Sequence, residues 1–426
     1  MKSITVILLD YTDHNALKRA LLSLDRVKCR IKSILHVGEQ SPAMRKSMYL
    51  QDIQHLMIRN QDIGAALSLA LPHIQSPYIL LLQDQDYLSP LVGPSSLELD
   101  ASKSVMTCRH QLGSMVIRRP FFIKTSYLVT TTFPSVNQLP FKEALIPSWL
   151  SRVEKEDVLP IEKEWIKQAK KNSSATQREK FNFLRKYTAA PHTAGWTQPT
   201  LAVIISCFNM APYVGATMSS CFFQHAQFEQ LLVIDDGSSD HSYKELEKWK
   251  GNEHVQVFQK ENGGKAIALN ELLTYVTTDF VLELDADDWL DPNAFLIIKE
   301  KLSTLSQDVS VLYGNFRKWK QLPTGGVMYI GTATGKAVKN RKDLLNYRFP
   351  LGPRIYRTSS LKEAGGFPIV DFEDGRLYED VSVLLQLLKD SRFSYQDFTV
   401  YNIREHDASI TKKNHSKWND FKQSLK

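Results

Sequence analysis

Four segments in the C-terminal half of the chain carry side chains that could bind a charged ligand. They lie at residues 207–209, 235–240, 262–265 and 285–288, with the sequences CFN, DDGSSD, NGGK and DADD. Three carboxylates within the four residues 285–288 repel one another unless something cationic lies among them. A divalent ion held by carboxylate and phosphate oxygens meets that need. Each segment alone is more typical of a turn, a helix start or a solvated loop, so the prediction depends on their joint occurrence.

Apolar runs before these segments indicate the elements that position them. The run LAVIIS at 201–206 and the run that opens QLLVIDDGSSD at 230–240 are typical of strands buried in a parallel sheet. Helical stretches alternate with these runs, which predicts an α/β fold with helices on both faces of a mostly parallel sheet. Ligands bind at the carboxyl ends of such strands, where all four segments fall.

An internal repeat defines the domain organisation. The stretch that runs from Asn60 to Pro90 matches the stretch from Asn262 to Pro292 without a gap, at a constant offset of 202 residues. We therefore predict two related α/β domains, at 1–155 and 199–426. Between them, 156–198 begins with polar helix formers and ends in AAPHTAGWTQP, which predicts a helical, proline-containing linker.

The second copy resembles the inverting family 2 glycosyltransferases of the GT-A fold. The matching motifs are CFNMAPYV, VIDDGSSD, NxGxxxALN and LDADDWLDP, and the resemblance covers about 200–411. It implies tandem GT-A domains, a nucleotide-diphosphate-sugar donor such as a UDP-sugar, and Mn²⁺ or Mg²⁺. Asp236 would contact the uracil ring, Asp285 would lie nearer the ribose, and Asp287 would bind the metal. The nucleotide-sugar set implied in this way comprises Cys207, Asn209, Asp236, Lys265, Asp285 and Ala286.

The resemblance also assigns an acceptor side. After the turn EAGGFP at 363–368, Asp380 occupies the position of the family's catalytic base, with Glu379 beside it. Such a base takes the proton of an acceptor hydroxyl. The competing interpretation is an acidic pair that favours a helix N-terminus. The closing segment at 401–411 places His406 near the metal or the phosphate.

Three further basic residues have open assignments. Lys265 either approaches the diphosphate or is solvated, and Arg354 and Arg357 are candidate contacts to the acceptor or the phosphate. Members of the family that extend polymers through a membrane carry a Q-x-x-R-W element, which LLQLLKDSRF at 384–393 lacks. The resemblance therefore implies transfer of one or a few sugars, in the synthesis of a surface or coat glycan.

The first copy has lost the acidic residues at the corresponding positions. Gln83 and Gln85 stand where the second copy has Asp285 and Asp287, and HVGEQ replaces IDDGS. Neutral amides are poor ligands for a divalent ion. We predict that the first copy is a non-catalytic domain that orients the acceptor, holds a partner or dimerises.

Composition limits the remaining function classes. The 426 residues include 43% hydrophobic residues and four cysteines, with a net charge of +7. This charge suits an anionic small molecule and is too small to predict nucleic-acid binding. The cysteines form no metal-binding or disulfide pattern. Neither a signal peptide nor a membrane span is evident, so we expect a cytoplasmic location. Peripheral contact with a membrane, or association with a spore or cell-surface assembly, stays open.

Two function classes remain in view. The first is a metal-dependent transferase that acts on a glycan or coat-protein acceptor. The second is a non-catalytic scaffold that binds a glycan or a partner through both domains. Turnover of a nucleotide sugar distinguishes them, and the oligomeric state stays open.

Overall fold

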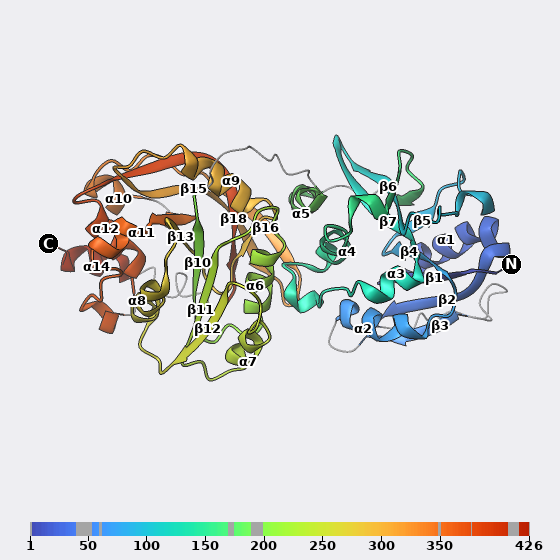
Figure 1. The fold of residues 1–426 in the computed structure, drawn as a ribbon, viewed down its shortest axis with the longest axis horizontal. Helices are drawn as coiled ribbons and strands as arrows, with labels where there is room; N and C mark the ends of the chain where they lie inside the picture. The colour runs from blue at the N-terminus through green and yellow to red at the C-terminus, as the bar shows by residue number, and fades with distance from the viewer. Residues whose placement is uncertain are drawn as a thin grey trace. The chain divides into compact units, whose positions relative to one another are not determined.

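The computed structural model describes residues 2–39, 53–58, 62–168, 174–188, 199–347, 351–375, 377–407 and 417–425. The chain divides into two compact units, Met1–Ala189 and Ala190–Lys426 (Figure 1). We describe each unit by itself. Among the residues just given, no helix has the length and apolar character needed to cross a membrane. All four cysteines are free thiols, in agreement with the absence of a disulfide pattern in the sequence.

The second unit is built on a mixed nine-stranded sheet in the order β12-β11-β10-β13-β17-β15-β18-β14, with β16 paired to β15. The pairs β12–β11, β11–β10 and β10–β13 are parallel, and β17 then runs antiparallel to β13. The strands are β10 (Leu201–Cys207), β11 (Gln230–Asp236), β12 (Val255–Lys260), β13 (Phe280–Glu283), β14 (Trp289–Leu290), β15 (Val309–Gln321), β16 (Val327–Ala333), β17 (Arg354–Arg357) and β18 (Arg392–Glu405).

Helices cover both faces of this sheet. Successive side chains of a strand point to opposite faces, so a strand with a continuous apolar run presents apolar side chains to the helices on each side. Val203 and Ile205 of β10 pack in the core that includes α6, whereas Ala202 and Ile204 pack in the core that includes α8. Both cores are apolar, as the continuous hydrophobic runs predict. The helices of this unit are α6 (Val214–Phe222), α7 (Ser242–Glu247), α8 (Lys265–Tyr275), α9 (Ala294–Ser303), α10 (Arg341–Leu345), α11 (Thr358–Glu363), α12 (Glu379–Leu387) and α14 (Trp418–Ser424).

The first unit has a seven-stranded sheet in the order β3-β2-β1-β4-β7-β6-β8. This order repeats that of the second unit from β12 to β18, and the α/β fold predicted from the sequence is confirmed. The strands are β1 (Ile4–Leu9), β2 (Ile31–Gly38), β3 (Ile53–Met57), β4 (Tyr78–Gln83), β5 (Asp86–Leu88), β6 (Val105–Leu112), β7 (Met115–Lys124), β8 (Val158–Ile161) and β9 (Ile166–Gln168). The helices are α1 (His14–Leu24), α2 (Ile63–Ala70), α3 (Thr125–Thr130), α4 (Leu145–Leu150) and α5 (Ala175–Leu184).

The segment predicted as a linker at 156–198 differs from the structure in its first part. β8 pairs with β6 at the edge of the sheet, and β9 pairs with β5, so residues 158–168 complete the first unit. An edge strand tolerates Pro160 and flanking charges, which made the segment resemble a connection. The predicted helix is present as α5, and the proline-containing tail at 189–198 lies outside the described residues, as does Gln61 in the first copy.

Candidate active site

The loop after β11 is fixed to the start of α8 by a buried carboxylate. Asp236 accepts hydrogen bonds from the backbone N–H groups of Gly263, at 2.9 Å, and Gly264, at 2.8 Å, and from the Lys260 ammonium at 3.1 Å. A Cβ on Gly237 would lie 2.5 Å from the backbone nitrogen of Asn262, so this close approach requires glycine. Asp236 therefore shapes the loop, and its predicted contact to a uracil ring stays a prediction.

The loop after β10 is tied to the same edge of the sheet by Asn209. Its side-chain oxygen accepts from the backbone N–H groups of Ser239, at 2.8 Å, and Asp240, at 3.3 Å. Cys207 is fully buried, and burial raises the pKa of its thiol to about 12. Ala286 is also buried. The side chains of Cys207 and Ala286 are therefore not exposed, and their predicted contact with a nucleotide sugar stays a prediction.

Three charged residues connect the strand ends, and we call Lys265, Glu283 and Arg354 the buried triad. Glu283 and Arg354 are buried, whereas the side chain of Lys265 is 28% exposed. The two carboxylate oxygens of Glu283 accept from the Arg354 guanidinium at 2.7 and 2.8 Å. Lys265 lies 2.9 Å from the same carboxylate, and the hydroxyl of Tyr356 donates to it at 3.0 Å. This geometry satisfies a carboxylate that is almost wholly removed from water.

The triad is held in its ionised form. Burial alone would raise the pKa of Glu283, but the adjacent Arg354 and Lys265 outweigh this effect and hold the pKa of Glu283 well below its ordinary value. Burial opposes the charged form of Lys265, whereas Asp285, Glu283 and Glu379 together raise the pKa of Lys265 well above its ordinary value. The Lys265 ammonium thus lies among three carboxylates, while its side chain stays 28% exposed, and its predicted approach to the diphosphate stays a prediction.

The loop after β13 places its three carboxylates in different surroundings. Asp285 is 37% exposed and lies 2.6 Å from the Lys265 ammonium, whereas Asp287 is 18% exposed and lies 2.9 Å from Nε2 of His406. Asp288 is buried and accepts from the backbone N–H of Arg404 at 2.8 Å. Burial, and repulsion from Asp287 and Asp285, raise the pKa of Asp288 well above its ordinary value. The sequence predicts repulsion among these three carboxylates. In the structure each has its own partner: Lys265 for Asp285, His406 for Asp287, and the backbone N–H of Arg404 for Asp288.

Asp287 and His406 are brought together as candidate metal ligands. No group of three or more His, Cys, Asp or Glu side chains suited to a metal ion occurs among the residues that the structure describes. An oxygen and a nitrogen donor 2.9 Å apart, with Asp287 partly exposed, do fit two positions of a coordination sphere. The other positions would have to come from a ligand or from water.

The start of α12 carries the two acidic residues predicted to lie on the acceptor side. Tyr378, in a left-handed conformation with φ 62°, precedes Glu379 and Asp380, which occupy the first turn of the helix. The side chain of Asp380 is 22% exposed and lies 3.5 Å from the Arg354 guanidinium. Glu379 lies 3.4 Å from Lys265, and burial raises the pKa of Glu379. Asp380 is therefore the accessible carboxylate of the pair, and Glu379 belongs to the charged surroundings of the triad.

The Gly-Gly-Phe turn before α12 is fastened to α8 through Asn270. The side chain of Asn270 accepts from the backbone N–H of Phe367 at 2.7 Å and donates to its carbonyl at 2.8 Å. Gly365 and Gly366 both have positive φ, and a Cβ on Gly366 would lie 2.3 Å from the Asn270 oxygen. Asn270 is the final residue of the NxGxxxALN motif, and this tether gives the motif a structural role.

The two arginines of β17 lie at opposite ends of the strand. Arg354 faces Glu283 at the carboxyl end of β13, whereas Arg357 faces Phe280 at its other end. Arg357 donates to the backbone carbonyls of Val309 and Ser306 at 3.0 Å each, and its guanidinium lies over the ring of Phe280. Its predicted contact to the acceptor or the phosphate is wrong, because a strand of four residues separates it from the site.

Several site residues were not singled out in the sequence. Glu283 could have been found because it lies two residues before Asp285 in LELDADD, and alternate strand residues share a face. Arg404 supports the loop after β13 by donating from Nε to the Asp287 carbonyl at 2.9 Å. Tyr213 packs its ring 4.6 Å from that of His406. Tyr213 lies in the motif CFNMAPYV and Arg404 in the closing segment 401–411, so the motifs located both residues without assigning them a role.

Residues 202–363 match the family model described as Glycosyl transferase family 2. This range lies within the second unit and contains β10 to β17, including the strand ends that carry Asp236 and Asp285. The second unit therefore contains the part of the chain that is similar to glycosyl transferase family 2. Arg404, His406 and the base candidate Asp380 lie beyond the matched residues.

The chain is also similar to polysaccharide synthases. It is 31% identical over 106 residues to the chondroitin synthase of Pasteurella multocida (strain Pm70), covering 24% of this chain and 11% of that protein. It is 32% identical over 95 residues to the poly-beta-1,6-N-acetyl-D-glucosamine synthase of Staphylococcus aureus (strain COL), covering 22% and 23%. The chain thus spans less than a quarter of the length of these curated relatives.

Solved structures give weaker likenesses. S. aureus TarS 1-349 in complex with UDP is 23% identical, with a TM-score of 0.37, over 48% of this chain and 60% of that one. Mannosyltransferase PcManGT from Pyrobaculum calidifontis, in complex with GDP-Man and Mn²⁺, is 16% identical, with a TM-score of 0.39, over 59% and 72%. Likenesses of this size carry no argument about the ligands of this chain.

Proposed function

We propose that the second unit transfers a sugar from a nucleotide-diphosphate sugar, a UDP-sugar in the first instance, to an acceptor hydroxyl with inversion. The family match over residues 202–363 supports a glycosyltransferase. The synthase relatives favour a surface or coat glycan as the product class. The absence of a Q-x-x-R-W element favours addition of one or a few sugars.

One observation carries this proposal, namely an unbroken chain of ion pairs from the donor side to the acceptor side. Asp285 contacts Lys265 at 2.6 Å, Lys265 contacts Glu283 at 2.9 Å, and Glu283 contacts Arg354 at 2.7 Å. Arg354 then lies 3.5 Å from Asp380. Burying charges is costly, and we infer that the buried pair of Glu283 and Arg354 serves to position the site. This chain fixes Asp380 relative to the loop that would bind the donor.

In the proposed reaction Asp380 removes the proton from the acceptor hydroxyl. The hydroxyl oxygen forms a bond to the anomeric carbon from the face opposite the diphosphate, whose bond to that carbon breaks with departure of the nucleoside diphosphate. Arg354 faces the Asp380 carboxylate and keeps it oriented. Asp287 and His406 would hold a divalent metal ion, which would supply positive charge near the departing diphosphate.

The test is metal-dependent transfer from UDP-sugars by the full chain and by Asp380→Asn. We expect Asp380→Asn to lower kcat about 10²–10⁴-fold while UDP affinity is retained, because the base contacts only the acceptor. Asp390→Asn is the matched control, since Asp390 is exposed at the end of the same helical segment. Equal kcat values for wild type and Asp380→Asn would exclude Asp380 as the base.

A second substitution addresses the metal. Asp287→Ala should weaken the metal dependence of UDP-sugar hydrolysis, because it removes an oxygen donor beside His406. Equal metal dependence in wild type and variant would contradict the proposed metal role. If the wild type binds nucleotide sugars without turning over any of them, the scaffold alternative replaces the transferase.

A further inference from the structure

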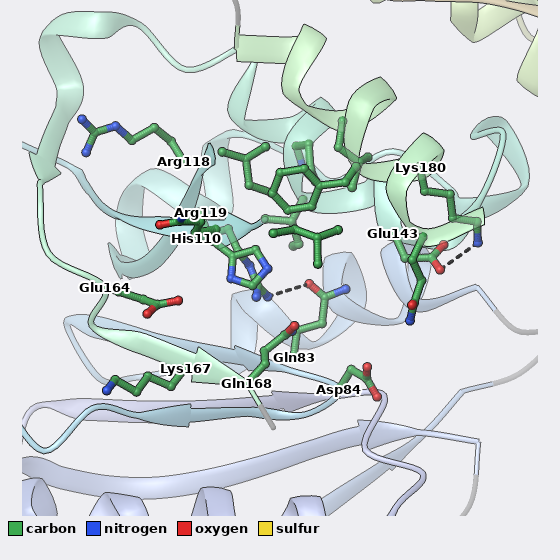
Figure 2. Close-up of a pocket in the computed structure, with 18 of the residues that line it drawn as sticks. Gln83, Asp84, His110, Arg118, Arg119, Glu143, Glu164, Lys167, Gln168 and Lys180 are labelled. Carbon is green, nitrogen blue, oxygen red and sulfur yellow. Dashed lines mark hydrogen bonds and ion pairs between the residues drawn. The ribbon is translucent and has the colours of Figure 1, made fainter. Parts of the chain in front are cut away.

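The first unit contains a cavity of about 1000 Å³ at the carboxyl end of β4, where Gln83 and Asp84 line it. This is the repeat's counterpart of the strand end that carries Asp285 in the second unit. Ligand pockets commonly enclose roughly 300–1,000 Å³, so the space suffices for an extended ligand. One wall comes from β9 and α5, which contribute Lys167, Gln168 and Phe181. Figure 2 shows Gln83, Gln168 and His110 lying together in this cavity.

The charges of the cavity are balanced, which disfavours a diphosphate. Arg119 pairs with the buried Asp86 at 2.6 Å, and Lys180 pairs with Glu143 at 2.8 Å, as the dashed line in Figure 2 marks. Arg118 pairs with Glu162. These three cations are already matched by carboxylates, and the two remaining lining cations, Arg19 and Lys167, are balanced by the lining Asp84 and Glu164.

His110 adds no charge to the cavity wall. Burial, reinforced by the neighbouring Arg119, lowers the pKa of His110 to about 3, so its ring is neutral near pH 7. Its Nδ1 is buried and lacks a hydrogen-bond partner among the residues that the structure describes. The ring packs at 5.7 Å against that of Phe181. The wall therefore combines an unmet hydrogen bond with an aromatic surface.

Neutral amides and apolar side chains make up much of the remaining lining. Four glutamines contribute, and each makes a hydrogen bond within the protein through one amide atom. An amide has two donor hydrogens and an acceptor oxygen with two lone pairs, so further capacity is left for sugar hydroxyls. Apolar surface beside them suits the C–H faces of a sugar ring. The glutamines are Gln83, Gln111, Gln168 and Gln177, and the apolar members include Tyr87, Ile117 and Phe181.

We propose that this cavity of the first unit binds an uncharged oligosaccharide. As a binding site it stands on the lining alone. The role of that saccharide as the glycan acceptor of the second unit rests on the proposed function. The non-catalytic copy then retains the position of a donor site and uses it for a neutral glycan.

The experiment measures equilibrium binding of neutral tetrasaccharides to the full chain without any nucleotide sugar. The probes are chitotetraose, cellotetraose and mannotetraose, and titration calorimetry measures the binding of each. We expect at least one to bind, and expect Gln83→Leu and His110→Phe each to raise its Kd about tenfold, the effect of one lost hydrogen bond. Gln85→Leu is the matched control, because the same substitution two residues away falls outside the lining, and it should leave Kd within twofold.

The proposal is overturned if no tetrasaccharide binds at millimolar concentration, or if Gln83→Leu and His110→Phe leave Kd unchanged. It is also overturned if tripolyphosphate or UDP displaces the saccharide in a manner that Gln83→Leu abolishes, since the cavity would then be an anion site. Thermal unfolding of each variant verifies that the first unit remains folded. No turnover enters these measurements, so a failure here and a failure of the transferase assay are separate results.

Discussion

The two units share one strand order, but at three matching positions the second unit has charged side chains and the first unit has apolar ones. The offset of 202 residues relates Lys265 to Ile63 and Glu283 to Leu81, and the registers of β4–β7 and β13–β17 relate Arg354 to Phe121. Ile63, Leu81 and Phe121 are all buried apolar residues. The fold therefore forms without the buried triad, and an apolar set occupies the same place.

This difference indicates what the triad is for. Replacement of a buried ion pair by apolar residues of similar volume is often neutral or stabilising, so stability alone does not explain the charges of the second unit. The unit that keeps Asp285, Asp287 and Asp380 also keeps the triad, and the unit with Gln83 and Gln85 lacks it. We interpret the triad as a device for positioning the site.

The largest expected effect comes from breaking the triad at one residue. Glu283→Leu leaves the buried Arg354 without its bidentate partner, and should destabilise the second unit by about 3–5 kcal/mol. The triple variant Lys265→Ile, Glu283→Leu, Arg354→Phe copies the first unit and should recover most of that loss while transfer stays abolished. Hydrogen exchange by mass spectrometry assigns the loss to one unit. A triple variant less stable than the single one would contradict the comparison.

The next effect concerns acid stability in the first unit. Burial lowers the pKa of His110 to about 3, from 6.5 for a histidine in the unfolded chain. The stability that the neutral ring contributes is therefore fully present above pH 6.5 and is lost as pH falls toward 3. The limiting slope is about 1.4 kcal/mol per pH unit. His110→Phe should remove this slope from denaturation curves of the first unit. Parallel pH profiles for wild type and variant would refute the assignment.

In the second unit, stability is lost over a lower pH range than in the first. Because Arg354 and Lys265 hold the pKa of Glu283 below its ordinary value of 4.5, its contribution is present above that value and is lost only as pH falls below it. Glu379, whose pKa is raised by burial, acts in the opposite sense and loses its contribution as pH rises. The triple variant should show a flatter profile below pH 4.5 than wild type.

The smallest effect separates the two arginines of β17. Arg357→Ala removes two hydrogen bonds to backbone carbonyls and should cost about 1–2 kcal/mol of stability, with kcat within twofold of wild type. Arg354→Ala should abolish transfer, because it leaves Glu283 without its bidentate partner. A large loss of kcat in Arg357→Ala would return Arg357 to the site.

Sequence patterns predicted the repeat and the strand ends, because these follow from hydrophobic periodicity and from motif order, whereas the place of His406 near the metal or the phosphate was implied by the family resemblance. They did not predict that Asp236 would be buried, since the groups that enclose its carboxylate come from Lys260, Gly263 and Gly264, in the next strand and loop. Arg357 was misassigned because proximity in sequence to Arg354 says nothing of the roughly 10 Å that three strand residues span. The role of β8 and β9 in the first unit was hidden by their charges and by Pro160.

Helix α8 has a consequence for how this chain can vary. Its first residue, Lys265, faces the donor side, and five residues later Asn270 holds the turn that leads to Asp380. The spacing amounts to about 7.5 Å along a rigid helix. A single inserted residue between them would rotate Asn270 by about 100° away from its turn. The helix thus fixes the distance and the angle between Lys265 and Asn270. We expect insertions to be excluded from residues 266–269, whereas surface loops tolerate them.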